Sequence, residues 1–188
     1  TPIILDSLKR EHKEIKVHFQ EKNIGEVKNF YFLLNWAQSE MEAEFFCWQS
    51  HDDIRVAKSL DKLANILNEK PNLIGVCSYT SRRDLSGKKL DPFMPDPLTQ
   101  NSPVLRLVFE WRKPLVTKYY GLFRLDLLPK ANDMYLGDYH DQIYLDRIIA
   151  KGQIDVIPEE LFIYRENLKK RRTSNDQFLK KLSKKPIF

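Results

Sequence analysis

Apolar residues recur along the first 80 positions at two alternating spacings. Residues 15–19 alternate apolar and polar side chains, as a half-buried strand does, whereas residues 26–38 repeat apolar side chains at helical spacing. The pattern predicts a strand at 15–19, a helix at 26–38, a strand at 44–48, a helix at 56–67 that Pro71 closes, and a strand at 74–80. This β-α-β-α-β order predicts an α/β fold with a mainly parallel central sheet flanked by helices.

The second half is patterned less regularly. Residues 91–103 hold four of the ten prolines and are predicted to form a loop. A short helix over 104–111, an apolar segment at 119–123, a helix from 141 to 151 and two closing strands at 154–157 and 161–164 are expected after it.

Composition favours one folded domain. The chain has 188 residues, of which 42% are hydrophobic and 30% charged, enough for one core and too few for two comfortable domains. Because it contains no apolar run of about 18 residues and no signal-like amino end, we expect a cytoplasmic protein. Cys47 and Cys77 lie in apolar strands, which favours reduced core thiols over a disulfide.

The net charge of +5 is concentrated at the carboxyl end. Residues 165–188 hold nine Lys and Arg against two acids, a net of +7, which leaves −2 for the rest. An acidic body argues against nucleic acid as a partner. We therefore divide the chain into a domain at 1–165 and a basic tail at 166–188, which either contacts an anionic membrane surface or is simply solvated.

Adjacent carboxylates follow the strand predicted at 44–48. Asp52 and Asp53 fall where strands of a parallel sheet end, which is where ligands gather in such folds. A divalent cation that holds a diphosphate would offset the repulsion of the pair. Two acids at this position are otherwise most often a helix cap.

The spacing around this pair resembles that of family 2 glycosyltransferases. The resemblance rests on four elements in order, namely Asn23-Ile-Gly25, Asn35-Trp-Ala37, the apolar strand Phe45-Phe-Cys-Trp48 and the acidic motif His51-Asp-Asp53. It continues through Asp84-Leu-Ser-Gly87, Tyr120-Gly-Leu-Phe-Arg124, His140-Asp141, Lys151-Gly152 and the segment 157–165. The similar region covers roughly residues 16 to 165, most of the chain.

The resemblance implies a Rossmann-like domain of GT-A type and an inverting sugar transfer from a nucleotide-diphosphate sugar, with a UDP-sugar as the expected donor. Asp141 would be the catalytic base, Asp53 the ligand of Mg²⁺ or Mn²⁺, and Asp52 and Asn23 donor contacts. A glycan or lipid-linked acceptor is implied. Asp141 would otherwise be an ordinary helix cap.

Other side chains near these motifs have ordinary explanations. Arg124, His140 and Arg165 are candidates for acceptor or phosphate contacts, although surface ion pairs explain the arginines equally well. Trp48 and Trp111 are expected to pack in the core.

The amino end departs from the family pattern, because the usual first strand is not found before residue 15. Asp6 would be the acid that contacts the nucleotide if residues 3–5 formed a strand, but residues 3–14 fit a helix slightly better. A glycosyltransferase-like binding or scaffolding module without turnover is therefore the alternative function.

Overall fold

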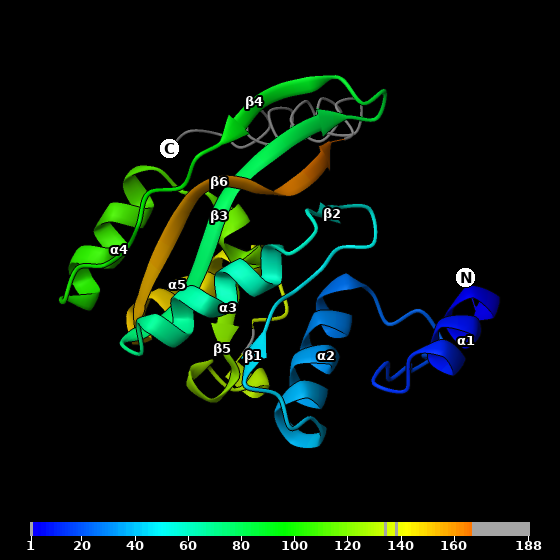
Figure 1. Ribbon diagram of the computed structural model, residues 1–188. Coiled ribbons are helices and arrows are strands. Elements are labelled where there is room, and N and C mark those ends of the chain that lie inside the picture. Colours follow the sequence, from blue (N-terminus) through cyan, green and yellow to red (C-terminus); the bar gives the residue numbers. More distant parts are fainter. Residues whose placement is uncertain (1, 134, 138, 167–188) are drawn as a thin grey trace, which may run out of the picture.

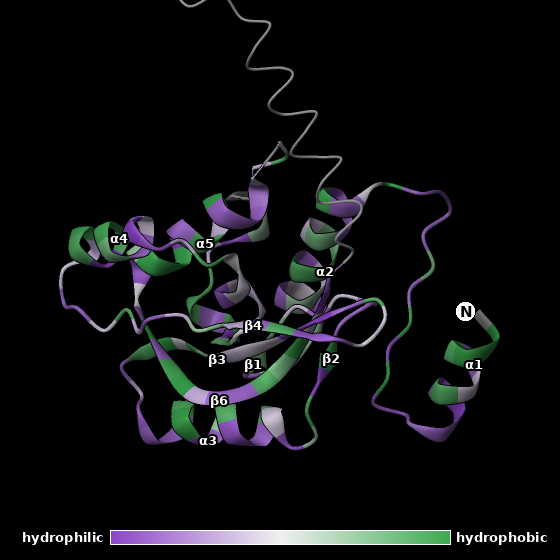
Figure 2. Cartoon of the chain, turned by 90° about the horizontal axis from the view of Figure 1, so that it is seen from above, coloured by the Kyte–Doolittle hydropathy of each residue, from purple (hydrophilic) through white to green (hydrophobic). Residues whose placement is uncertain are grey.

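The computed structural model describes residues 2–133, 135–137 and 139–166, so the predicted basic tail lies outside the described residues apart from Glu166. A curved sheet lies between two layers of helices (Figure 2). Helix α3 (Ser59–Glu69) covers one face, and α2 (Glu26–Glu40), α4 (Pro103–Arg112) and α5 (His140–Lys151) cover the other. These four helices confirm the helices expected from the apolar spacing.

Two long parallel strands form the centre of the sheet. β3 (Leu73–Asp84) pairs with β6 (Gln153–Glu166) along its whole length. The other strands are shorter: β1 (Phe45–Phe46), β2 (Ile54–Arg55), β4 (Lys89–Phe93) and β5 (Leu122–Arg124), in the order β1-β5-β3-β6-β2 with β4 beside β3. All four of their remaining pairings, β1 with β5, β5 with β3, β4 with β3 and β2 with β6, are antiparallel.

The expected mainly parallel sheet is therefore wrong, although the α/β class is confirmed. One reason lies in the turn at 84–87, where the Asp84 carboxylate accepts hydrogen bonds from the backbone N–H groups of Ser86 (2.9 Å) and Lys88 (3.0 Å). Gly87 takes a positive φ of 88° there, which glycine allows without strain. The chain folds back as a hairpin, so β4 occupies the start of the segment predicted as loop.

The two strands expected near the carboxyl end are one strand, β6. Its register against β3 slips at Pro158, since Ser78 pairs with Ile157 and Tyr79 pairs with Glu160. Proline has no N–H to donate to the ladder, so the strand bulges there and then continues. Alternation of apolar residues on either side of the bulge looks like two separate strands in the sequence.

The core has a part on each face of the sheet. Between α3 and the sheet pack Leu63, Leu67, Val76 and Leu161, while the larger part under α2 and α5 is built around Trp48, Phe123, Tyr144 and Ile148. Trp48 is 2% exposed and stacks on Tyr119 with ring centroids 4.1 Å apart, which confirms its predicted core position. Trp111 is 69% exposed, so the core position expected for it is wrong.

The amino-terminal segment lies beside the body of the fold. Residues 2–11 form helix α1 (Pro2–Glu11), which confirms the helical alternative, and α1 stands apart from the sheet (Figure 1). The strand expected at 15–19 is not formed: these residues pair with no strand in the described part of the chain. No helix among the described residues has the length and apolar character needed to cross a bilayer.

Candidate functional site

The loop between β1 and β2 carries the two adjacent acids, and they have different surroundings. Asp53 is 9% exposed, and its Oδ1 accepts a hydrogen bond of 2.9 Å from the backbone N–H of Arg165, near the end of β6. Burial raises the pKa of Asp53, the negative charge of Asp52 adds to the rise, and the Arg165 N–H opposes it.

Asp52 faces solvent. The hydroxyl of Ser50 donates a hydrogen bond to its Oδ1, and this bond is the main cause of a lowered pKa for Asp52. The backbone carbonyl of Asp52 accepts a bond from Arg165 Nε. Arg165 thus binds the acidic loop with both its main chain and its side chain, and it is the candidate phosphate contact that lies at this loop.

Tyr120 links the acidic loop to α5. Its ring stacks on Phe162 of β6 with centroids 5.1 Å apart, and its carbonyl accepts a hydrogen bond of 2.7 Å from Arg55. Burial raises the pKa of Tyr120, and the negative charges of Asp53 and Asp141 raise it further because they disfavour a phenolate.

Asp141 is the second residue of α5. Its Oδ1 accepts a hydrogen bond of 2.8 Å from the N–H of Gln142, the next residue. The N-cap of the helix is Tyr139, without a side-chain capping bond, so Asp141 lies in the first turn and is not the cap that the ordinary explanation expects. Its charge also contributes to raising the pKa of the buried neighbour Tyr119. His140, the first residue of the helix, packs its ring 6.0 Å from that of Phe30 on α2.

Asn23 lies at a pocket of about 250 Å³ at the start of α2, which Glu26 also lines. The Asn23 side chain accepts a hydrogen bond of 2.8 Å from the N–H of Gly25, whose φ of 82° is in the region that glycine tolerates. The Glu26 carboxylate adds to the raised pKa of both Tyr119 and Tyr120.

Two candidate residues lie elsewhere. Arg124 donates a hydrogen bond of 3.1 Å to the carbonyl of Leu73, where β3 begins, and pairs with Glu44 at 3.6 Å. Leu73 and the acidic loop are at opposite ends of the central strands, about 30 Å of strand length apart. Asp6 is exposed on α1, outside the group. The structure thus brings Asp52, Asp53 and Arg165 together at the acidic loop. His140 and Asp141 lie at the start of α5, Asn23 lies at the pocket before α2, and Asp6 and Arg124 lie elsewhere.

No protein-family model and no curated protein matches the chain. Among solved structures, its fold is similar to that of the glycosyltransferase TarS from S. aureus, determined for residues 1–349, with a TM-score of 0.64 and 19% sequence identity. The likeness covers 88% of this chain and 47% of that one, so the chain spans less than half of the TarS structure. The two chains share a fold over this region.

The acidic loop is the place where the sequence predicts a divalent cation. Among residues 2–133, 135–137 and 139–166, no group of three or more His, Cys, Asp and Glu side chains could hold a metal ion. Asp52 and Asp53 supply at most two carboxylates, and one oxygen of each already accepts a hydrogen bond. This set fits Mg²⁺, which proteins commonly hold with one or two carboxylates while substrate phosphates and water complete the shell.

Sequence patterns did not single out three residues of the group. Tyr120 belongs to the segment quoted for the resemblance but carried no assigned role, and Glu26 was counted as the start of a helix. Arg55 holds the group together, because its guanidinium donates to the carbonyls of Trp48 (2.9 Å) and Tyr120 (2.7 Å). A lone Arg in a short edge strand gives no sequence signal of this kind.

Proposed function

We propose that this chain carries the catalytic centre of a glycosyltransferase that moves a sugar from a nucleotide-diphosphate sugar to an acceptor hydroxyl with inversion at the anomeric carbon. The observation that supports the proposal is the acidic loop, in which the Arg165 N–H holds the buried Asp53 and the adjacent Asp52 is left exposed. The glycosyltransferase-like fold supports it.

Asp141 has the role of general base in this proposal. The acceptor hydroxyl loses its proton to the Asp141 carboxylate as its oxygen attacks the anomeric carbon, and the bond between that carbon and the diphosphate breaks. The Asp141 carboxylate is half-buried at a helix start, held by its bond to the Gln142 N–H, so its position is defined before substrate binds.

The acidic loop holds the diphosphate side of the donor. Asp52 is the better placed metal ligand, because it is exposed and ionised, whereas Asp53 is buried and bound to Arg165. Asp53 then positions Asp52 and completes the pair. Mg²⁺ or Mn²⁺ bound there would supply positive charge for the departing nucleoside diphosphate. The pocket at Asn23 and Glu26 is the proposed place of the donor nucleotide, with UDP as the first nucleotide to test.

Calorimetry with UDP, with and without Mn²⁺, tests the donor site. We expect metal-dependent binding that Asp52→Asn abolishes and that Asp61→Asn, a change at an exposed acid on α3, leaves intact. A screen of nucleotide sugars for metal-dependent release of the nucleoside diphosphate tests turnover without a known acceptor.

Asp141→Asn separates binding from chemistry. Loss of a general base costs about 10²–10⁴-fold in rate, so this variant is expected to bind UDP as the parent protein does and to lose turnover by that factor. Turnover within threefold of the parent would remove Asp141 from the base role.

The alternative, a binding module without turnover, is favoured by one observation. Helix α1 stands apart, and Asp6 on it is outside the group that faces the donor (Figure 1). Metal-dependent UDP binding with no turnover on any nucleotide sugar would support this alternative.

A further inference from the structure

Helix α4 buries charged side chains and exposes apolar ones. Arg106 is 4% exposed and Glu110 is 0% exposed, so two of the three charged side chains of the helix point into the protein, and only Arg112 at its end is exposed. Its exposed side chains are mostly large and apolar: Val104, Leu105, Val108, Phe109 and Trp111 are between 45% and 69% exposed. A surface helix ordinarily buries its apolar stripe and exposes its charges.

The buried charges fix this orientation. Arg106 donates hydrogen bonds to the carbonyls of Ile149 (2.8 Å) and Ala150 (3.1 Å) in the last turn of α5, where helix carbonyls lack helical partners. It also binds the carbonyls of Gln100 and Asn101, which precede α4.

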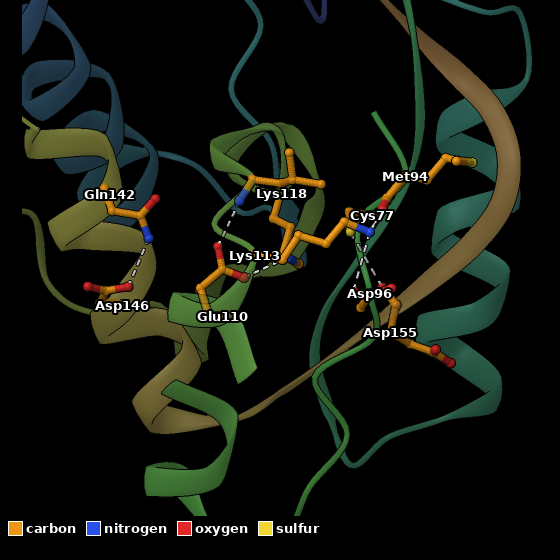
Figure 3. Close-up of polar contacts among 10 residues, drawn as sticks. Cys77, Met94, Asp96, Glu110, Lys113, Lys118, Gln142, Asp146 and Asp155 are labelled. Carbon is orange, nitrogen blue, oxygen red and sulfur yellow. Dashed lines mark hydrogen bonds and ion pairs between the residues drawn. The ribbon is translucent and has the colours of Figure 1, made fainter. Parts of the chain in front are cut away.

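Glu110 is held as firmly. One of its oxygens pairs with Lys118 Nζ at 2.6 Å and the other accepts a bond of 3.2 Å from the N–H of Leu115 (Figure 3). Rotation of α4 to bury its apolar face would break all these bonds and leave buried polar groups unpaired. The exposed apolar face is therefore built into the fold.

The face continues into a groove between α4 and α5, which pack side by side (Figures 1 and 2). The groove encloses about 590 Å³ and is lined mainly by Leu107, Val108 and Trp111 of α4 and by Ile143 and Ala150 of α5. Exposed apolar areas of this kind usually mark interaction surfaces.

Exposed cations lie on both helices that form the groove. Arg147 lines it, and Arg112 and Lys151 are exposed on the same two helices. Asp146, the acid at the groove, accepts a hydrogen bond of 3.0 Å from Gln142 on its own helix (Figure 3). The surface thus combines an apolar strip and an interfacial Trp with a positive border, which complements an anionic layer above a hydrocarbon layer.

We propose that the exposed face of α4 and the groove beside α5 form a docking surface for an anionic phospholipid membrane. Val108 and Trp111 insert among the upper acyl chains, and Arg112, Arg147 and Lys151 contact lipid phosphates. A second copy of the chain fits less well, because a two-fold contact centred on the groove would bring the same cations against one another. The proposal does not depend on glycosyl transfer.

Flotation of the full chain with vesicles tests the proposal. We expect binding to phosphatidylcholine vesicles that contain phosphatidylglycerol and little binding to phosphatidylcholine alone. Val108→Ser/Trp111→Ser should remove most of the binding, whereas Leu85→Ser, at an apolar side chain 69% exposed in the β3–β4 turn, should not. Equal binding by the parent and the double variant overturns the proposal and places the contact elsewhere, for example in the basic tail.

A second vesicle experiment tests the role of the cations. It compares Arg147→Gln/Lys151→Gln with the control Arg83→Gln/Lys88→Gln, which removes two exposed cations from the distant β3–β4 hairpin. A cation at an anionic surface contributes about fivefold in partition, so the first pair should weaken binding about 25-fold more than the second. Equal loss in both pairs would indicate attraction by total charge and contradict docking through α5.

Trp111 reports the contact directly. The difference between the emission of the parent and that of Trp111→Phe isolates Trp111 from Trp36 and Trp48, and this difference should shift to the blue and be quenched by brominated lipid. An unchanged difference spectrum contradicts insertion. Concentration-dependent dimers that Val108→Ser/Trp111→Ser abolishes, without vesicle binding, would assign the face to self-association instead.

Discussion

The backbone N–H of Arg165 donates a hydrogen bond of 2.9 Å to Oδ1 of Asp53 and thereby fastens the acidic loop to the end of β6. The side chain of Arg165 adds a bond to the carbonyl of Asp52, so one residue fixes both members of the acidic pair. The two acids therefore have different roles: the Asp53 carboxylate binds the backbone of β6, and the Asp52 carboxylate faces solvent.

Asp53→Ala should destabilise the fold by about 1 kcal/mol, because it leaves the N–H of Arg165 without its partner in a part-buried place. Asp52→Ala should change the free energy of unfolding by about 0.5 kcal/mol or less, as surface substitutions usually do. Urea unfolding of both variants and the parent measures the two values. Equal effects would contradict the division of roles.

The pH dependence of stability should also distinguish Asp53 from Asp52. Because the pKa of Asp53 is raised in the folded chain, the folded state binds more protons than the unfolded state above the ordinary Asp value of about 4. Its stabilising effect is therefore present at and below that pH and is lost as the pH rises through the folded pKa. Asp53→Asn cannot ionise, so the stability of the parent relative to this variant should fall as the pH is raised from about 4 toward neutrality.

Asp52 is the control, because its pKa is lowered and its contribution to stability should therefore change with pH in the opposite direction. Its contribution is present above the ordinary Asp pKa and is lost as the pH falls through the lowered folded value. The stability of the parent relative to Asp52→Asn should thus rise with pH over the acidic range. Urea midpoints at a series of pH values give both slopes, and slopes of the same sign would be incompatible with the two environments.

The helices were predicted correctly from the spacing of apolar residues. α2, α3, α4 and α5 were all expected within a few residues of their ends, because each carries its apolar residues at helical spacing. Strand direction was not accessible, since a two-residue segment such as β2 has no pattern of its own and takes its direction from β6. Hairpin formation at 84–87 depended on a positive φ at Gly87 that spacing alone does not specify.

The site was accessible only in part. The acids at 52, 53 and 141 could be identified as candidates, but the environment of Tyr120 depends on the packing of its ring on Phe162 and on the bond from Arg55, which the sequence does not show. The reversed polarity of α4 was hidden for a similar reason. Trp111 was predicted to lie in the core because aromatic residues usually do. It is exposed because α4 turns Glu110 inward to pair with Lys118 and Arg106 inward to bind the end of α5. Both partners lie outside α4, so the spacing of residues within the helix does not reveal them.

Lys118→Met should be among the most destabilising changes in the chain. Lys118 and Glu110 are 2% and 0% exposed and 2.6 Å apart, and removal of one partner leaves the other as an unpaired buried charge. Such losses cost about 3–5 kcal/mol. Lys118→Met/Glu110→Gln removes both charges while a Gln oxygen can still accept the bond from the Leu115 N–H, so the double variant should be more stable than Lys118→Met alone. Additive effects in a double-mutant cycle by urea unfolding would exclude a coupled pair.

The two free thiols should differ in reactivity. Burial raises the pKa of the Cys77 thiol to about 12, so almost no thiolate is present near pH 8. Cys47→Ala should therefore show no reactive thiol toward a disulfide reagent in native buffer and one thiol in denaturant. Cys77→Ala retains the half-buried Cys47, whose pKa burial also raises, and should react slowly in native buffer. Fast native labelling of Cys47→Ala would show that the strand β3 opens readily.

Tyr120→Phe tests whether the Tyr120 hydroxyl takes part in the proposed reaction. The raised pKa of Tyr120 keeps its hydroxyl protonated, so the group can donate a hydrogen bond to the reacting substrate throughout the neutral range. Loss of one such bond is expected to lower kcat about tenfold, with little change in the urea midpoint because the stack on Phe162 is retained. Tyr139→Phe, at a tyrosine 70% exposed beside α5, should leave kcat unchanged. An unaltered kcat in Tyr120→Phe, together with loss of turnover in Asp141→Asn, would confine the chemistry to the start of α5 and make Tyr120 a packing residue.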